Sequence, residues 1–432
     1  MIKKIAISVI AAALVLTSAC STKQGGNGDA ASAKAGNQTE QKKDEPVTLK
    51  LFLGGYSKER FMTTFGNYIA VKYPNVTFEL YGEKESLTDV VASGVKLDML
   101  QSTNPFTSIF DNKLEDDISD LIKTYKYDLN SLDPAVLGQM QALGKGKIYG
   151  FPNGIASYGL FYNKDLFDKF GVPYLKNGMT WDEIYELAKR LTARDGQTDY
   201  LGFLADTSSL IRYNQLSQGP VDPKTEKATV NVNNFKRIFE NIDRFYKIPR
   251  DSSTVYSFAK EKNVAMQAGQ IGQSGFKSNN AAGVKWGVVT MPEFSDLRGI
   301  GPMPLVPYFY VAKTSQHRDW AFKVVAFIGS EGFQSESVQD GSMPALKKRM
   351  DYKAEYGIRD PEMKGQNLIE SFHKTFAKLY EPTKYDDKVF SEIIAALNDV
   401  ITSKKDINTA LREAEEKANK AIAEIKAKDG KN

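Results

Sequence analysis

The sequence contains little of the chemistry that cysteine and histidine provide. Its 432 residues include one cysteine and two histidines. A single cysteine cannot form a disulfide within the chain. Neither His317 nor His373 lies near a second histidine, a cysteine or a carboxylate at the spacing of a metal site. We therefore expect no metal, no cofactor and no redox role.

Signatures of common enzyme classes are missing as well. The chain has no G-x-S-x-G motif and no glycine-rich phosphate loop. The loose pattern S-x-x-K begins at Ser93, Ser257, Ser274 and Ser371, but no K-T-G accompanies it, which indicates chance matches. The 53 acidic residues allow many carboxylate pairs, and nothing singles out one pair for glycoside hydrolysis. We expect no enzymatic activity, with a surface glycan-active enzyme as an alternative.

Long hydrophobic runs, basic clusters and repeats are also lacking. No stretch is long and apolar enough to span a bilayer. Lysine and arginine number 57, and no basic block is interleaved with aromatic residues, so nucleic-acid binding is not expected. No internal repeat is visible at periods of roughly 20 to 50 residues. The roughly 385 residues from Val47 onward exceed what one core usually serves, which predicts two domains.

The N-terminus has the features of an export signal. Lys3 and Lys4 precede an apolar run over residues 5–16, and small residues follow it up to Cys20. The segment L-T-S-A-C that ends at Cys20 resembles the lipobox of bacterial lipoproteins, in which the cysteine is acylated and becomes the first mature residue. We expect a signal peptide over residues 1–19 and a lipid anchor at Cys20. A secreted protein with an incidental cysteine is the alternative.

Residues 20–46 should form a flexible tether. From Ser21 to Pro46 the chain contains no aliphatic residue larger than alanine, so it cannot bury apolar surface. Such a tether would let a folded body move above the membrane that holds its anchor.

The start of the folded part alternates between strand and helix patterns. Apolar residues alternate over 47–53 and 76–80, and a third apolar strand is expected over 97–100. Helices are expected between these strands, over 57–69 and 87–91. This order predicts a parallel sheet with helices on its faces, and ligands of such sheets bind beyond the carboxyl ends of the strands.

Several later elements are also legible. Residues 200–204 should form a strand followed by a polar loop over 206–209, and residues 235–246 show the 3.6-residue period of a helix. Two apolar stripes, over 389–401 and 411–425, predict C-terminal helices with packing faces.

Residues 145–192 carry four motifs in order. They read Y-G-F-P at 149–152, Y-N-K-D-L-F at 162–167, G-V-P at 171–173 and T-W-D-E at 180–183. The last motif is a capping box, in which the threonine and glutamate side chains satisfy free amides at a helix start. This ordered series resembles the family 1 extracellular solute-binding proteins, which serve ABC importers, mostly for sugars.

The resemblance implies a two-lobe α/β fold of the periplasmic-binding-protein type (type II). Each lobe would be a mainly parallel sheet flanked by helices, with the ligand in a cleft between the lobes. The N-terminal lobe would comprise residues 47–151 plus 308–342, and the C-terminal lobe residues 152–307 plus 343–432.

A sugar offers hydroxyl groups at its edges and weakly apolar C–H faces. Its recognition needs aromatic rings beneath the faces and polar side chains at the edges. The candidates for ligand binding lie at strand ends and lobe crossings: Tyr56, Gln101, Ser102, Asn153, Tyr158, Tyr213, Gln273 and Tyr308. Each could instead pack a strand end or shape a turn. We interpret Trp181 as a core residue.

The resemblance implies a monomeric, lipid-anchored binding protein on the outer face of the bacterial cytoplasmic membrane. It would close around an oligosaccharide by hinge motion and present it to ABC permease subunits. Relatives often follow the strand that ends near Met266 with G-G-x-W or G-P-W, but residues 269–275 read G-Q-I-G-Q-S-G here. Two alternatives beside the enzyme therefore stay open: a non-sugar or anionic solute such as a polyol phosphate, and a sensor or adhesion lipoprotein with the same fold.

Overall fold

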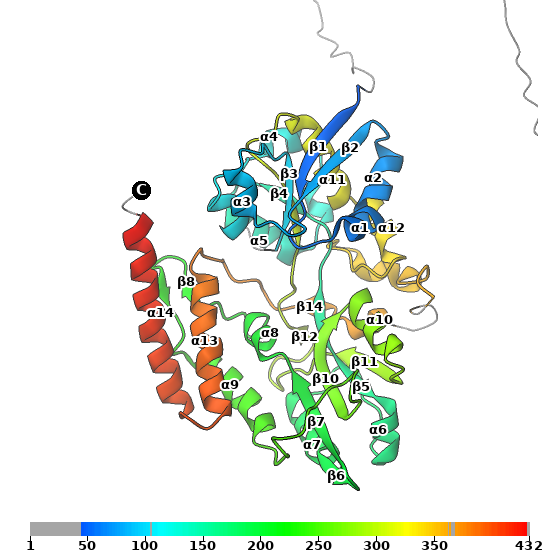
Figure 1. The fold of residues 1–432 in the computed structure, drawn as a ribbon, viewed down its shortest axis with the longest axis vertical. Helices are drawn as coiled ribbons and strands as arrows, with labels where there is room; N and C mark the ends of the chain where they lie inside the picture. Colours follow the sequence, from blue (N-terminus) through cyan, green and yellow to red (C-terminus); the bar gives the residue numbers. More distant parts are fainter. Residues whose placement is uncertain (1–44, 104–105, 362, 364–367, 430–432) are drawn as a thin grey trace, which may run out of the picture. The chain divides into compact units, whose positions relative to one another are not determined.

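The computed structural model describes residues 45–103, 106–361, 363 and 368–429. Residues Pro46–Asn432 form one compact unit that contains two five-stranded sheets (Figure 1). The expected signal peptide over 1–19, Cys20 and nearly all of the expected tether lie outside the described residues.

The first sheet has the strand order β2-β1-β3-β13-β4. Its strands are β1 (Val47–Phe52), β2 (Val76–Tyr81), β3 (Met99–Ser102), β4 (Gly150–Pro152) and β13 (Tyr308–Val311). β1 pairs in parallel with β2 and β3, whereas β13 runs antiparallel to β3 and β4. The register places Tyr308 opposite Ser102 on one side and Pro152 on the other.

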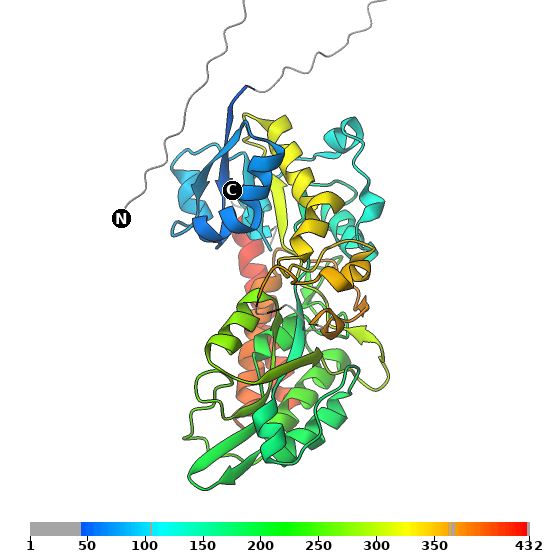
Figure 2. The same cartoon turned by 90° about the vertical axis from the view of Figure 1, so that its right-hand side faces the viewer.

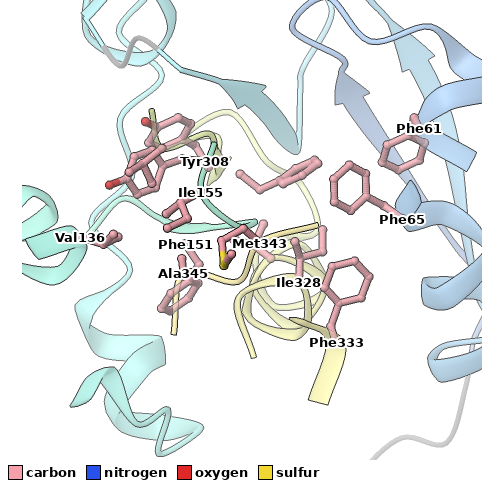
Figure 3. Close-up of a cluster of buried hydrophobic side chains, with 14 of the residues drawn as sticks. Phe61, Phe65, Val136, Phe151, Ile155, Tyr308, Ile328, Phe333, Met343 and Ala345 are labelled. Atoms are coloured by element: carbon pink, nitrogen blue, oxygen red, sulfur yellow. The ribbon is translucent and has the colours of Figure 1, made fainter. Parts of the chain in front are cut away.

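The helices around this sheet come from two separate parts of the sequence. They are α1 (Lys58–Phe61), the π-helical η1 (Met62–Gly66), α2 (Asn67–Lys72), α3 (Leu87–Ala92), η2 (Phe106–Phe110), α4 (Ser119–Thr124), η3 (Leu129–Ser131), α5 (Pro134–Gly144), α11 (Arg318–Gly329) and α12 (Glu331–Val338). α11 packs along β4 and β13, as Figure 2 shows in yellow. The buried ring of Phe65 packs edge-on against Phe309, with ring centroids 5.0 Å apart. It also stacks on Phe333, with centroids 5.8 Å apart (Figure 3). Residues from both parts of the sequence therefore share one core.

The second sheet has the order β11-β5-β10-β7-β6. Its strands are β5 (Ser157–Asn163), β6 (Ala193–Asp195), β7 (Thr198–Ala205), β10 (Val264–Ile271) and β11 (Trp286–Thr290). Its neighbouring helices are α6 (Lys164–Lys169), α7 (Trp181–Leu191), α8 (Thr207–Arg212), α9 (Asn233–Tyr246) and α10 (Gln273–Ala281). The predicted capping box of α7 is confirmed, because the Glu183 N–H donates to Thr180 Oγ1 at 3.2 Å and the Thr180 N–H donates to Glu183 Oε2 at 2.7 Å.

The chain ends in two long helices, α13 (Asp386–Ile401) and α14 (Ile407–Asp429), which pack against each other and against α9 (Figure 1). The two predicted apolar stripes are confirmed as packing faces, since Val389, Ile393 and Leu411 are fully buried there. The remaining elements are β8 (Val221–Asp222) with β9 (Lys227–Ala228), β12 (Ile300–Gly301) with β14 (Thr375–Phe376), η4 (Arg349–Glu355) and η5 (Leu368–Ser371).

Three stretches of chain are hydrogen-bonded where the chain passes from one sheet to the other. The Ile155 N–H donates to the Met343 carbonyl at 2.8 Å, and the Ala156 N–H donates to the Leu305 carbonyl at 2.8 Å. Gly154 has a φ of +140°, and a Cβ there would lie 2.8 Å from the Met343 carbonyl oxygen, so only glycine fits this passage. The exact lobe boundaries stay a prediction.

Two sequence-based expectations need correction. Both sheets are mixed rather than mainly parallel: β5 and β13, which carry the chain between the sheets, run antiparallel to their neighbours, and a tight turn joins β6 to β7. The expected polar loop over 206–209 is instead the start of α8, because the Asp206 side chain caps this helix by accepting from the Ser208 N–H at 3.1 Å.

Candidate functional site

A cavity of about 330 Å³ is bordered by the first sheet and its helix α5, by the end of α8 beside the second sheet, and by the C-terminal part of the chain. Its volume is typical of small-molecule sites, which span about 300–1,000 Å³. The lining residues come from the end of β3, α5, the end of α8, the segment before β13, β13 itself, the segment before α13, and α13: Thr103, Gln139, Leu143, Arg212, Tyr213, Met303, Pro304, Leu305, Val306, Tyr308, Leu379, Tyr380, Pro382, Thr383, Asp386, Asp387 and Phe390.

Four aromatic rings line this cavity: Tyr213, Tyr308, Tyr380 and Phe390. The Tyr213 ring stacks on Tyr158 with centroids 5.2 Å apart, and burial raises the pKa of Tyr213 to about 12. The Tyr308 hydroxyl donates to Gln139 Oε1 at 3.1 Å, and burial raises its pKa. Both hydroxyls therefore stay protonated at neutral pH; the Tyr213 hydroxyl can donate a hydrogen bond beside an apolar ring face, whereas the Tyr308 proton is already directed at Gln139.

Of the three charged residues that line the cavity, two form an ion pair and the third, an aspartate, has no basic partner in the lining. Arg212 Nη1 lies 2.8 Å from Asp387 Oδ1, and the guanidinium lies 4.7 Å from the Phe390 ring centroid. The second acid, Asp386, is only 8% exposed. The Thr383 hydroxyl donates to Asp386 Oδ1 at 2.6 Å, while Oδ2 is buried without a hydrogen-bond partner among the described residues.

The environment of Asp386 disfavours its charged form. Burial raises the pKa of Asp386 to about 6, although contacts with Thr383 and Tyr380 lower it in part. Tyr380 thus lies close to the carboxyl group without reaching Oδ2 in hydrogen-bonding geometry. A buried carboxylate oxygen without a donor is costly, so this atom is a prominent candidate for a ligand contact.

Three of the predicted binding residues, Tyr56, Gln101 and Asn153, lie along the carboxyl ends of β1, β3 and β4, and we call them the polar edge. Gln101 Oε1 and Asn153 Oδ1 are both buried without a hydrogen-bond partner among the described residues. Burial raises the pKa of Tyr56, and the Asn153 side chain lowers it in part, which places these two side chains together. Gln101 and Asn153 each neighbour in sequence a residue that pairs with Tyr308, but none of the three side chains of the polar edge is among the residues that line the cavity.

The other predicted residues fall at different places. Tyr213 and Tyr308 line the cavity, as expected. Tyr158 lies beneath Tyr213, where its hydroxyl accepts from Ser209 at 3.1 Å, and borders a smaller cavity of about 40 Å³. Ser102 is half-buried opposite Tyr308. Gln273 begins α10, but its side chain lies outside the described part of the structure.

Sequence reasoning considers Arg212 beside Tyr213, but it does not select Gln139, Tyr380, Asp386 or Asp387 as ligand-binding residues. In the sequence, Tyr380 and Asp386 come just before the apolar stripe of α13, in a stretch that carries no recognisable motif. They reach the cavity only through tertiary packing. The charge pair between Arg212 and Asp387 would have been the one available signal, but its partners lie 175 residues apart.

Three further observations concern the structure away from the cavity. Trp181 is a core residue, as predicted, because it is buried and packs edge-on against Phe203 and Phe245. No group of three or more metal-ligating side chains is placed to hold an ion in the part of the chain that the structure describes. None of the described helices combines the length and apolar content needed to cross a bilayer.

Comparison with known proteins adds three relatives. The chain is 23% identical over 302 residues to the sn-glycerol-3-phosphate-binding periplasmic protein UgpB of Rhizobium meliloti (strain 1021), covering 64% of this chain and 69% of that protein. It is 23% identical over 327 residues to the galactooligosaccharide-binding protein of Bacillus subtilis (strain 168), covering 70% and 72% of the two proteins. An ABC substrate-binding protein of Listeria monocytogenes, solved in complex with cycloalternan, matches with a TM-score of 0.68 and 16% identity over 88% of this chain and all of that one.

The structural likeness confirms the predicted α/β periplasmic-binding-protein fold. Residues 58–335, more than half of the chain, match the sequence profile of the family described as bacterial extracellular solute-binding protein. This match agrees with the family resemblance of the four ordered motifs over residues 145–192. The chain therefore belongs to the bacterial extracellular solute-binding protein family.

Proposed function

We propose that this protein captures a carbohydrate, most simply an oligosaccharide, in the 330 Å³ cavity and delivers it to an ABC importer. The family is non-enzymatic, which overturns the alternative of a glycan-active enzyme. The observation that carries the proposal is the combination of four aromatic rings with hydroxyl, amide and carboxylate groups around one cavity. Rings contact the C–H faces of a sugar, and the polar groups bond its hydroxyls.

Two of the relatives support a sugar ligand, since one is a galactooligosaccharide-binding protein and another was solved with cycloalternan. A third is an sn-glycerol-3-phosphate-binding protein, which makes an anionic solute the second candidate. The observation in favour of this candidate is Arg212, a cation in the cavity lining that could pair with a phosphate.

We further propose that each sheet, with its helices, acts as one lobe and that the lobes close around the solute. The three hydrogen-bonded stretches near Ile155, Leu305 and Met343 would serve as the hinge. The solute would bridge groups on both sides, such as Tyr308 of the first sheet and Tyr213 beside the second. A ligand that contacts both sides has higher affinity for the closed state and so shifts the population toward it.

A thermal-shift screen tests the carbohydrate proposal directly. The panel contains maltotetraose, mannotriose, a galactooligosaccharide and sn-glycerol 3-phosphate. A solute present at a hundred times its dissociation constant should add about 2.7 kcal/mol to the free energy of unfolding and raise Tm by a few degrees. We expect stabilisation by at least one neutral glycan. A folded protein that responds to none of the glycans would contradict the proposal.

Two tyrosine variants show whether binding uses the cavity. Tyr213→Ala removes a ring and a hydroxyl from the lining and should weaken glycan binding at least about tenfold. Tyr174→Ala is the matched control, because Tyr174 is 43% exposed and lies outside the cavity lining. Equal losses in the two variants would argue against this cavity as the binding site.

We also propose that Cys20 carries the lipid anchor, on the strength of the L-T-S-A-C segment and the apolar run before it. The full chain expressed in a bacterium should sediment with membranes, and Cys20→Ala should move most of it to the soluble fraction. Incorporation of labelled palmitate into the full chain, absent in Cys20→Ala, gives an independent readout. Equal membrane fractions and no label in either protein would exclude the anchor.

A further inference from the structure

We propose that Asp386 determines specificity at this site: its free Oδ2 accepts a hydrogen bond from a solute hydroxyl, and the cavity excludes phosphorylated and carboxylated solutes. This inference rests on the proposed function, because it concerns the same cavity. The carbohydrate proposal gives Asp386 no specific role, and this inference supplies one. It also favours neutral carbohydrates over anionic solutes.

The first support is the geometry of the carboxyl group. Asp386 is the first residue of α13, lines the cavity and is 8% exposed. Its Oδ1 accepts from the Thr383 hydroxyl at 2.6 Å, but its Oδ2 has no partner among the described residues. Tyr380, which also lines the cavity, lies close to this carboxyl group, but no described residue donates to Oδ2 in hydrogen-bonding geometry, so a solute hydroxyl would be its first donor.

The second support is the charge balance of the lining. Two acids, Asp386 and Asp387, face one base, Arg212, and the lining includes no lysine or histidine. Arg212 is already engaged, with Asp387 at 2.8 Å and with the Phe390 ring at 4.7 Å. The partial positive charge at the N-terminus of α13 is also compensated, because both acids lie in the first turn of this helix. The charge left over in the cavity is therefore negative.

These two features discriminate between solute classes. A sugar hydroxyl is neutral and carries the proton that Oδ2 lacks, so it gains a charge-assisted hydrogen bond. A phosphate or carboxylate group carries negative charge and, when fully ionised, has no proton to donate. Near Asp386 it would meet a like charge in a partly desolvated space, which disfavours binding.

The experiment compares Asp386→Asn with wild type by isothermal titration calorimetry. The probes are maltotetraose, mannotriose, galactotriose and sn-glycerol 3-phosphate. Asparagine keeps an acceptor for Thr383 and replaces the free acceptor with an amide donor. We expect affinity for the bound neutral glycan to fall at least tenfold. Asp296→Asn, which removes an exposed acid outside the lining, is the matched control and should stay within twofold of wild type. Melting curves establish that every variant is folded.

The outcomes separate this inference from the proposal on which it rests. A neutral glycan that binds wild type and loses affinity only in Asp386→Asn supports both. A neutral glycan that binds wild type and Asp386→Asn within twofold overturns the inference and leaves the carbohydrate function standing. Binding of sn-glycerol 3-phosphate to wild type more tightly than any glycan overturns both. Binding of no probe overturns the carbohydrate function, and the inference with it.

Discussion

Replacing Arg349 with methionine should lower the free energy of unfolding by about 3–5 kcal/mol. Arg349 and Asp133 form an ion pair in which the two residues are 5% and 7% exposed. Arg349 Nη2 also donates to the Lys374 carbonyl at 2.6 Å. Methionine fills a similar volume but leaves Asp133 Oδ2 buried without its donor and removes the partner of the Lys374 carbonyl. Chemical denaturation followed by circular dichroism, at neutral pH, measures the loss.

A second substitution tests whether the loss comes from the unpaired charge. Asp133 also caps α5, by accepting from the Ala135 N–H at 2.9 Å, and asparagine retains an acceptor for this cap. The double variant Asp133→Asn with Arg349→Met removes both charges and should recover much of the stability that the single variant loses. Lys388→Ala, which breaks an exposed ion pair with Glu392, should cost under about 1 kcal/mol. A similar cost for Arg349→Met would show that the buried pair does not hold these segments together.

Replacing Asp386 with asparagine should have the opposite effect and raise the free energy of unfolding by about 3 kcal/mol at pH 7. Burial raises the pKa of Asp386 from the usual 3.8 to about 6, so keeping this side chain ionised at neutral pH costs the folded state stability. Asparagine removes the charge and keeps an acceptor for the Thr383 hydroxyl. The titratable groups that act on Asp386 are Asp387 on the same helix and the Tyr380 hydroxyl, while Arg212 on α8 lines the same cavity and pairs with Asp387.

The pH dependence identifies the cause of this gain. The folded protein holds the Asp386 proton more tightly than the unfolded chain does. The contribution of this group to the free energy of unfolding is therefore fully present below about pH 3.8 and is lost as the pH rises to about 6. The difference between Asp386→Asn and wild type should therefore be small near pH 4, grow up to about pH 6 and stay constant above it. Unfolding measured between pH 4 and pH 8 gives this curve, and a difference independent of pH would rule out a buried charge as the reason.

This prediction matters for the site because it separates stability from affinity. If Asp386 serves the ligand, the same variant should be more stable and bind less well, which is the usual relation between a strained binding site and the fold around it. If Asp386→Asn lost binding because it unfolds, the variant would instead have both a lower free energy of unfolding and a lower affinity for the ligand.

Local sequence patterns predict the parts of the fold that follow from local chemistry. Alternating apolar residues predict β1 and β2 because each strand has a buried face, and the Thr180–Glu183 capping box predicts the start of α7. The polar loop expected at 206–209 is wrong because Asp206 can cap a helix as readily as it can form a turn. Strand direction in the second sheet depends on which strands carry the chain between sheets, and no local pattern encodes that.

The candidate site is predictable only where it coincides with strand ends. Tyr308 and Tyr213 reach the cavity, and Gln101 and Asn153 lie at the carboxyl ends of β3 and β4, in agreement with the rule for open α/β sheets. Asp386 escapes prediction because its sequence neighbours show only the packing stripe of α13. Its exposure and its unpaired oxygen are properties of the folded chain and have no counterpart in composition or spacing.

The position of β13 has a consequence for the order in which the protein folds. β13 begins at Tyr308 and pairs with β3 and β4, whose last residues are Ser102 and Pro152. When β4 has been synthesised, the strand that belongs between it and β3 does not yet exist, and the whole second sheet must be made first. During that interval β3 and β4 each have an unpaired edge, which invites pairing with other chains. The first sheet to begin is therefore among the last parts to be completed, and a chain held unfolded until residue 311 has been made avoids this exposed intermediate.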